Sequence, residues 1–399
     1  MSVAALLAEH GSPLWLADVD RARERLAGFR AAWSAAWPDV EIAYSYKTNR
    51  TTAFLRAFAD EGAGAEVACA AEYALARDVV GVEGSRITVN GPGKPTALLE
   101  HAAADGALVI ADSAPELERL ALAGVTRVGL RVGLPGPEGH PSRFGLAPGR
   151  VVAAGRRARG LGLTLEVLSV HLVSTDFTAA ADRDRALAAS VRVAWSKPPA
   201  VHAQAATALA RLARELDVAT IDLGGGLPAA PAVAAHAAAV AQALHADGFA
   251  GRLLLEPGRA LVADAVDLAC TVVAVKTLAD GTTCAVVDAG TDLLAGTLWA
   301  WPRLEALEPR DGTTPTLVAG PLCLNIDVLC PAAQLGDLAP GNVLMARDVG
   351  AYQQAQSTRF GDLRPAVIAR DGGRWRLHRR REETSDLILH DRDEPSWSA

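Results

Sequence analysis

A lysine at the end of an apolar, aromatic segment is the first residue whose position suggests chemistry. Lys47 follows Tyr46 in the run AYSYKTNR. An ammonium group is costly to bury unless it is paired or its pKa falls, so most lysines at strand ends reach solvent. A lysine with a depressed pKa can instead form a Schiff base with a carbonyl compound. Taken alone, Lys47 leaves both interpretations open.

Three consecutive glycines form a second candidate site. Gly224, Gly225 and Gly226 follow the apolar run that ends at Leu223. The backbone N–H groups of such a segment can surround a phosphate, and a flexible turn is the alternative. The spacing matches neither the dinucleotide fingerprint nor the Walker loop, so neither nucleotide site is predicted.

A carboxylate and a guanidinium group flank a Pro-Gly turn in the run LLLEPGRALVADA. Glu256 could hold a pyridine nitrogen protonated, and Arg259 could bind a phosphate or a carboxylate. A salt bridge at the rim of a barrel is the alternative. His171 ends another apolar run, where a lone histidine is more often structural than catalytic.

Two segments near the carboxyl end carry weaker signals. GPLCLNID contains Cys323 and Asp327, and RDVGAYQQA contains Tyr352. A buried cysteine usually packs as a small apolar residue, and a tyrosine usually fills space. Each signal is weak by itself, but the order of all these segments along the chain is informative.

Short apolar runs alternate with longer amphipathic segments from about residue 40 to 265, which predicts buried parallel strands separated by helices. The predicted strands are residues 41–46, 86–90, 107–113, 127–132, 167–173, 219–225 and 252–258. The predicted helices are Thr51–Asp60, Ala71–Val80, Ala114–Ala123, Pro148–Gly160 and Ala203–Leu216. The repeated polar or glycine residues after strands favour a (β/α)₈ barrel over a doubly wound sheet.

The pattern changes after residue 265. β-branched runs separated by Asp280-Gly281 indicate a hairpin, and further strand-like runs follow. The early run PLWLAD is also strand-like and precedes the alternating series. We therefore expect a barrel over residues 25–265 and an all-β domain built from residues 1–24 and 266–399.

Composition limits the class of protein. The chain has 399 residues, of which half are hydrophobic, and a net charge of −7, which excludes a disordered chain and argues against a nucleic-acid binder. No stretch fits a membrane span or a signal peptide. The five cysteines are never spaced C-x-x-C, so we expect no metal site, no disulfide framework and a cytoplasmic location.

Taken together, these segments resemble the fold-type III pyridoxal-phosphate decarboxylases, the group of ornithine, arginine and diaminopimelate decarboxylases, and most closely the diaminopimelate branch. The similarity runs from Pro13 to about Pro365. The matching motifs are Tyr46-Lys47-Thr48-Asn49, residues 62–76, 89–94 and 110–117, Arg143-Phe144-Gly145, His171, Gly224–Gly226, Glu256–Arg259, Cys323 with Asp327, and Tyr352.

The resemblance implies a barrel that carries pyridoxal 5'-phosphate, a second β domain and a homodimer with active sites at its interface. Lys47 would hold the cofactor, Glu256 its pyridine nitrogen and His171 its ring face. The glycines, Tyr352 and Arg259 would bind the phosphate, unless Arg259 meets a substrate carboxylate. Cys323 would donate a proton, with Lys47 as the rival. The residues expected to bind substrate are Arg259, Asp327, Arg143 and Leu324.

Three departures from the family pattern bear on the substrate. His171 is followed by Leu172 rather than closely by Gly-Ser, and Leu324 stands where diaminopimelate and ornithine enzymes carry an acidic residue. The positions of an Arg-Pro and a Tyr that bind the distal carboxylate of diaminopimelate are occupied by Gly296, Thr297 and Ala300, beside Trp299 and Trp301. A leucine cannot fix a distal ammonium group as a carboxylate does.

These departures predict an amino acid or amino-acid conjugate other than meso-diaminopimelate as the substrate, as in natural-product or siderophore branches of the family. Two alternatives stay open. One is a racemase or epimerase on the related barrel, which Glu256 and Cys323 disfavour. The other is a homologue that binds the cofactor without catalysis.

Overall fold

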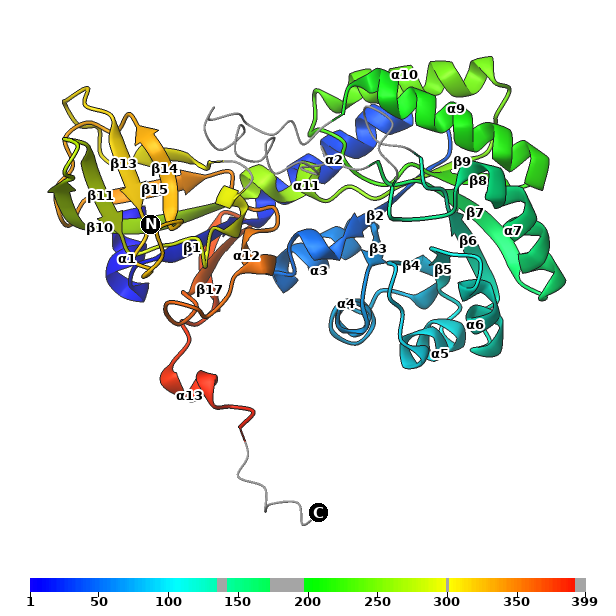
Figure 1. The fold of residues 1–399 in the computed structure, drawn as a ribbon, viewed down its shortest axis with the longest axis horizontal. Helices are drawn as coiled ribbons and strands as arrows, with labels where there is room; N and C mark the ends of the chain where they lie inside the picture. Colours follow the sequence, from blue (N-terminus) through cyan, green and yellow to red (C-terminus); the bar gives the residue numbers. More distant parts are fainter. Residues whose placement is uncertain (135–141, 173–196, 299–300, 392–399) are drawn as a thin grey trace, which may run out of the picture. The chain divides into compact units, whose positions relative to one another are not determined.

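A computed structural model describes residues 1–134, 142–172, 197–298 and 301–391 (Figure 1). The chain divides into two compact units. One contains Val19–Ala265 and Gly350–Ala355, and the other contains Met1–Asp18, Val266–Val349 and Gln356–Ala399. The expected boundary at residue 25 falls inside helix α2 (Val19–Ala36), which packs as a whole on helices of the first unit.

Eight parallel strands of the first unit close into a barrel within the described ranges, because β9 pairs with β2. In order, they are β2 (Val40–Ser45), β3 (Gly64–Val67), β4 (Ile87–Asn90), β5 (Leu108–Ala111), β6 (Arg127–Arg131), β7 (Thr164–Ser169), β8 (Thr220–Asp222) and β9 (Arg252–Leu255). This order confirms the predicted (β/α)₈ barrel and excludes the doubly wound sheet.

The barrel interior is a packed core. Ala43, Ile110, Val167 and Leu254 belong to one buried cluster although they come from strands that are not all neighbours. Side chains from β2, β5 and β7 can meet only inside a closed barrel. Each fully buried aliphatic side chain contributes about 1.5–3 kcal/mol, so this layer supports the rim above it.

Helices follow the strands, as the apolar periodicity predicts. The described helices of this unit are α2, α3 (Thr52–Asp60), α4 (Ala70–Ala74), α5 (Thr96–Ala104), α6 (Glu116–Leu122), α7 (Pro148–Gly160), α9 (Pro199–Leu216), α10 (Val233–Ala246) and α11 (Arg259–Val262). The predicted helix Ala71–Val80 is α-helical only to Ala74 and continues as a π-helical turn, Leu75–Val80. In the described ranges, no helix combines the length and the apolar character that crossing a bilayer requires.

One barrel strand was absent from the sequence prediction. β3 is only four residues long and begins with a glycine, so it shows little strand character. Gly64 is required there, because a Cβ at this position would lie 2.7 Å from the Arg86 carbonyl oxygen. The close approach of β3 to its neighbour therefore depends on a residue that lowers strand propensity.

The second unit is a mainly antiparallel sheet, which confirms the predicted all-β domain. Its described strands are β1 (Leu14–Asp18), β10 (Val266–Thr277), β11 (Thr283–Val287), β12 (Arg303–Ala306), β13 (Thr316–Ala319), β14 (Val328–Ala333), β15 (Val343–Arg347), β16 (Val367–Asp371) and β17 (Arg374–Arg379). The Asp280-Gly281 turn joins β10 to β11 as predicted.

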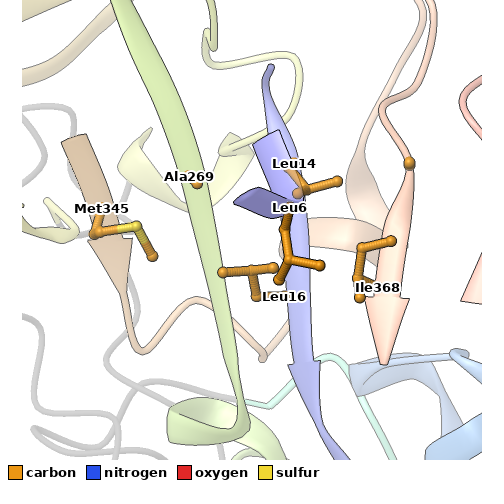
Figure 2. Close-up of a cluster of buried hydrophobic side chains, with 7 residues drawn as sticks. Leu6, Leu14, Leu16, Ala269, Met345 and Ile368 are labelled. Atoms are coloured by element: carbon orange, nitrogen blue, oxygen red, sulfur yellow. The ribbon is translucent and has the colours of Figure 1, made fainter. Parts of the chain in front are cut away.

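The amino-terminal strand is central to this sheet. β1 pairs antiparallel with β10 and parallel with β16, so it joins segments far apart in the sequence. Figure 2 shows the core at this junction, where Leu6 of helix α1 (Val3–His10) packs with Leu14, Met345 and Ile368. Two further short helices are α12 (Gln353–Gln356), most of which belongs to the barrel unit, and α13 (Thr384–Leu387).

Candidate active site

Polar side chains stand at or just beyond the carboxyl end of every barrel strand. They are Lys47, Glu66, Asn90, Asp112, Arg131, His171, Asp222 and Glu256. In a parallel barrel, all strand carboxyl ends share one rim, and active sites are built there. Three of the residues that the sequence singled out, Lys47, His171 and Glu256, therefore belong to one rim.

Lys47 lies in a single 3₁₀ turn, Tyr46–Thr48, that ends strand β2. Its Nζ atom lies 2.8 and 2.6 Å from the two carboxylate oxygens of Glu66. Burial alone would lower the pKa of Lys47, but the carboxylates of Glu66 and Glu256 outweigh it and raise the pKa. In this arrangement, the pKa of Lys47 is therefore raised and not lowered, as a Schiff-base lysine was expected to show, because two carboxylates face its ammonium group.

Glu66 was missed by the sequence analysis. Its side chain is fully buried on β3. Burial, together with the nearby charge of Glu256, raises the pKa of Glu66 to about 7 despite the opposing effect of Lys47. The protonation of Glu66 is therefore linked to the charges of Lys47 and Glu256.

Glu256 is held ionised by its neighbours. The Asn90 amide donates to both of its carboxylate oxygens, at 3.0 and 3.2 Å, and Nδ1 of His171 lies 3.9 Å away. Burial would raise the pKa of Glu256, but the interactions with His171, Lys47 and Asn90 lower it. A carboxylate that stays charged at the mouth of the barrel can bind a protonated ring nitrogen.

The glycine triplet passes close to His171 without side chains of its own. The Gly225 N–H donates to Nδ1 of His171 at 3.3 Å. A Cβ on Gly224 would lie 2.6 Å from the Val170 carbonyl oxygen, and one on Gly225 would lie 2.8 Å from that of Glu256. Burial lowers the pKa of His171, which favours a neutral ring. The triplet is thus a tight cradle that any side chain would disrupt.

Asp222 fixes the start of this cradle. It accepts hydrogen bonds from the Ser169 hydroxyl at 2.6 Å and from the Gly224 N–H at 2.8 Å. Burial and the charge of Glu256 raise the pKa of Asp222 well above its usual range. Asp222 therefore links the ends of β7 and β8 to the glycine loop.

Arg259 and Tyr352 come together beside the lysine turn. The Arg259 guanidinium lies 5.2 Å from the Tyr352 ring centroid, and the Tyr352 N–H donates to the Thr48 carbonyl at 2.8 Å. Tyr352 has a φ of 69°, an unusual value for a bulky residue and one that often marks a functional site. Asn49 adds a second link, because its amide donates to the Gly350 carbonyl at 2.9 Å.

The Arg143-Phe144-Gly145 segment is attached to the same rim. The guanidinium groups of Arg143 and Arg131 lie 3.8 and 4.5 Å from the Phe144 ring centroid. The Gly145 N–H donates to the Asp112 carboxylate at 3.2 Å. Arg143 itself is exposed.

The remaining candidates lie in the sheet unit. Cys323 and Leu324 are exposed on the loop before β14. Asp327 is buried, and its two carboxylate oxygens accept the N–H groups of Thr291 and Leu322 at 2.7 and 2.8 Å. Among the residues singled out for their departure from the family, Trp299 and Ala300 lie outside the described residues.

The barrel rim fits a flat, phosphate-bearing aldehyde such as pyridoxal 5'-phosphate. It offers an amine, an ionised carboxylate for a ring nitrogen, and a loop of glycines that runs beside His171 without side chains of its own. Lys47, Glu256 and the loop at Gly224 are the residues that would hold these three parts. The donor set therefore suits the cofactor that the resemblance implies.

Comparisons with known proteins identify the family of the chain. The sequence model described as "Pyridoxal-dependent decarboxylase, pyridoxal binding domain" matches residues 24–263. The chain therefore belongs to the pyridoxal-dependent decarboxylase family and is a pyridoxal-phosphate-dependent carboxy-lyase that acts on an amino acid. Decarboxylation, rather than racemisation, is the activity of this family.

Individual relatives extend over nearly the whole chain. Diaminopimelate decarboxylase of Deinococcus radiodurans is 29% identical over 94% of this chain and 95% of its own length. The solved diaminopimelate decarboxylase of M. jannaschii with L-lysine has a TM-score of 0.86 at 22% identity, covering 98% of this chain and 94% of that one. The arginine decarboxylase of Paramecium bursaria Chlorella virus gives 0.78 at 19% identity, covering 92% and 99%. These structural likenesses show that the fold is shared.

Proposed function

We propose that the chain decarboxylates an amino acid, or an amino-acid conjugate, whose distal end is less cationic than that of meso-diaminopimelate. The observation that carries the proposal is Leu324, which is 41% exposed beside the exposed Cys323. An acidic residue expected at this position would bind a distal ammonium group, whereas leucine offers only apolar contact. The curated relatives are named diaminopimelate decarboxylase, which makes diaminopimelate the competing substrate.

The barrel residues divide the chemistry between them. The cofactor supplies an electron sink for the electron pair released when CO₂ leaves the substrate. Lys47 attaches the cofactor, and its ammonium must first lose a proton to act as a nucleophile. Glu66, 2.6 Å from Nζ, would hold this ammonium in place until the proton leaves, because its carboxylate raises the pKa of Lys47. Glu256, whose pKa is lowered by His171, Lys47 and Asn90, would hold the ring nitrogen of the cofactor in its protonated form.

The other rim residues orient the cofactor. The neutral ring of His171 would lie against the cofactor ring, and the glycine loop Gly224–Gly226 would approach the phosphate. The N–H groups of Gly224 and Gly225 already donate to Asp222 and His171, so Gly226 would be the backbone donor to the phosphate. Tyr352 and Arg259 lie beside the lysine turn and would add a hydroxyl and a guanidinium to the phosphate. Arg259 could instead bind a substrate carboxylate.

Substrate binding and the final proton transfer are assigned to the exposed loop. Cys323 would return a proton to the substrate carbon, with Lys47 as the rival donor. Arg143, Leu324 and Asp327 are the proposed substrate-side residues, although the carboxylate of Asp327 is already bonded to backbone N–H groups. We infer a homodimer in which Cys323 and Asp327 serve the barrel of a second copy. The exposure of Cys323 and of the neighbouring Leu324 supports this inference.

A substrate panel tests the proposal. The purified holoenzyme is offered meso-diaminopimelate, ornithine, arginine, lysine and N-acylated or otherwise conjugated amino acids, and CO₂ release is measured. We expect the highest kcat/KM with a compound that lacks a free distal ammonium group. Turnover of meso-diaminopimelate at about 1–10³ s⁻¹ would reject the substrate proposal and leave decarboxylation itself intact.

A further inference from the structure

Asn90 bonds to Glu256 across the mouth of the barrel. Asn90 ends β4 and Glu256 follows β9, and these strands are not neighbours in the barrel order. Nδ2 of Asn90 nevertheless lies 3.0 and 3.2 Å from the two carboxylate oxygens. Both side chains are buried, with 6% and 1% of their surfaces exposed. The contact is therefore a long-range one that only the closed barrel creates.

The orientation of the Asn90 amide is set by charge. An ionised carboxylate only accepts hydrogen bonds, so the amide must present its NH₂ group rather than its oxygen. As a result, Oδ1 of Asn90 has no hydrogen-bond partner within the described ranges. A buried polar atom left in this way costs free energy, which an apolar residue of similar size would avoid. Space filling alone therefore gives no reason for an asparagine here.

The other groups that face Glu256 either lie farther from its carboxylate than Asn90 does or are titratable. Nδ1 of His171 is 3.9 Å away and accepts the Gly225 N–H, while Nζ of Lys47 is bonded to Glu66. Asp222 and Glu66 place further acidic groups near Glu256. Among these neighbours, Asn90 is the donor that does not titrate. Its hydrogen bonds to the Glu256 carboxylate therefore remain when Lys47 or Glu66 changes protonation state.

We propose that Asn90 is a positioning residue, which keeps the Glu256 carboxylate ionised and oriented toward the ring nitrogen of the cofactor. The inference rests on the proposed role of Glu256. Asn90 itself needs no contact with the substrate, and it acts before cofactor binding as well as after it.

The first readout uses the protein without cofactor. The titration of Glu256 is followed by infrared spectroscopy of ¹³C-glutamate-labelled protein and assigned by its absence in Glu256→Gln. We expect Asn90→Leu, which removes the donor at similar volume, to raise the Glu256 midpoint by about one pH unit, a tenfold change in proton affinity. Asn90→Asp should raise it further, since it places a second carboxyl beside the first. Asn90→Asp also keeps the side-chain shape if the leucine variant fails to fold.

A second readout uses the holoenzyme. The pH dependence of the visible absorption band of bound pyridoxal phosphate should shift in Asn90→Leu and stay unchanged in Val89→Ala. Val89 is buried on the same strand and points to the opposite face, so this variant controls for a weakened β4. An unchanged Glu256 midpoint in both Asn90 variants overturns the proposal. A wild-type band and cofactor affinity in Glu256→Gln would instead overturn the role of Glu256.

Discussion

The barrel rim and the Cys323 loop are organised in opposite ways. At the rim, side chains bond to one another: the half-buried Lys47 to the buried Glu66, and the buried Asn90 to the buried Glu256. On the loop, Cys323 is exposed, and the one buried carboxylate holds only backbone N–H groups. The rim is thus assembled within one chain, whereas the loop presents its side chains outward, as a part completed by another surface would. Preorganised groups of the first kind lower the cost of positioning reactants.

The largest effect should come from removing the amine at the rim. Lys47→Ala should abolish the visible band of the holoenzyme and lower kcat/KM at least about 10³-fold, because it removes the proposed attachment point of the cofactor. Borohydride reduction followed by peptide mapping should place the pyridoxyl group on Lys47 in the wild type.

The sequence offers matched controls for this variant. Lys276→Ala removes an exposed lysine of the sheet unit and should leave the band intact. Lys94 is a buried lysine, and it is bonded to Glu116 at 3.0 Å. A pyridoxyl adduct on Lys94 or Lys276 instead of Lys47 would reject Lys47 as the residue that binds the cofactor.

A backbone position should produce the next largest effect. A Cβ on Gly258 would overlap the hydroxyl of Thr48, the residue that follows Lys47. Gly258→Ala should therefore displace the lysine turn, lower kcat about 10²-fold and reduce the free energy of unfolding by about 1–3 kcal/mol.

The control is a glycine with room for a methyl group. Gly149 lies in the first turn of α7, and a Cβ added there would meet no atom within 4 Å, so Gly149→Ala should be neutral or stabilise by up to about 1 kcal/mol. Urea unfolding and steady-state kinetics separate the two variants. Equal activity in Gly258→Ala and Gly149→Ala would show that the lysine turn can move without loss of function and that the rim is not rigidly organised.

Asp327→Asn tests the loop. One acceptor oxygen becomes an NH₂ group that faces a backbone N–H, so unfolding should require about 1–3 kcal/mol less. The same change should alter the rate at which Cys323 reacts with a thiol reagent, because the bond to Leu322 lies next to it. Asp280→Asn, which affects an exposed turn bond to Thr282 at 3.0 Å, is the matched control. Unchanged stability and labelling would show that Asp327 does not organise this loop.

The sequence predicted the barrel and several rim residues, but it did not predict which side chains pair with one another. The barrel, most strands and residues such as Lys47 and Glu256 follow from apolar periodicity and from what stands after each strand. Glu66 was missed because its strand β3 is four residues long and starts with glycine. The role of Asn90 could not be predicted, because only barrel closure brings the end of β4 within hydrogen-bond distance of the residue after β9, and no local pattern encodes this contact. The burial of Asp327 likewise depends on the distant Thr291.

The smallest predicted effect concerns Glu66 and the pH dependence of the unfolding free energy. The pKa of Glu66 is raised by burial from 4.5 to about 7, so the folded protein binds more protons than the unfolded chain between these values. Its contribution to stability is therefore complete below about pH 4.5 and is lost as the pH rises through about 7. Glu66→Gln should remove this part of the decline in unfolding free energy in the protein without cofactor. Urea unfolding at several pH values, with the exposed Glu100→Gln as a control for losing one carboxyl, measures the difference. Identical pH slopes in wild type and Glu66→Gln would mean that the rim proton resides on another group, with Asp222, whose pKa is also raised, as the next to test.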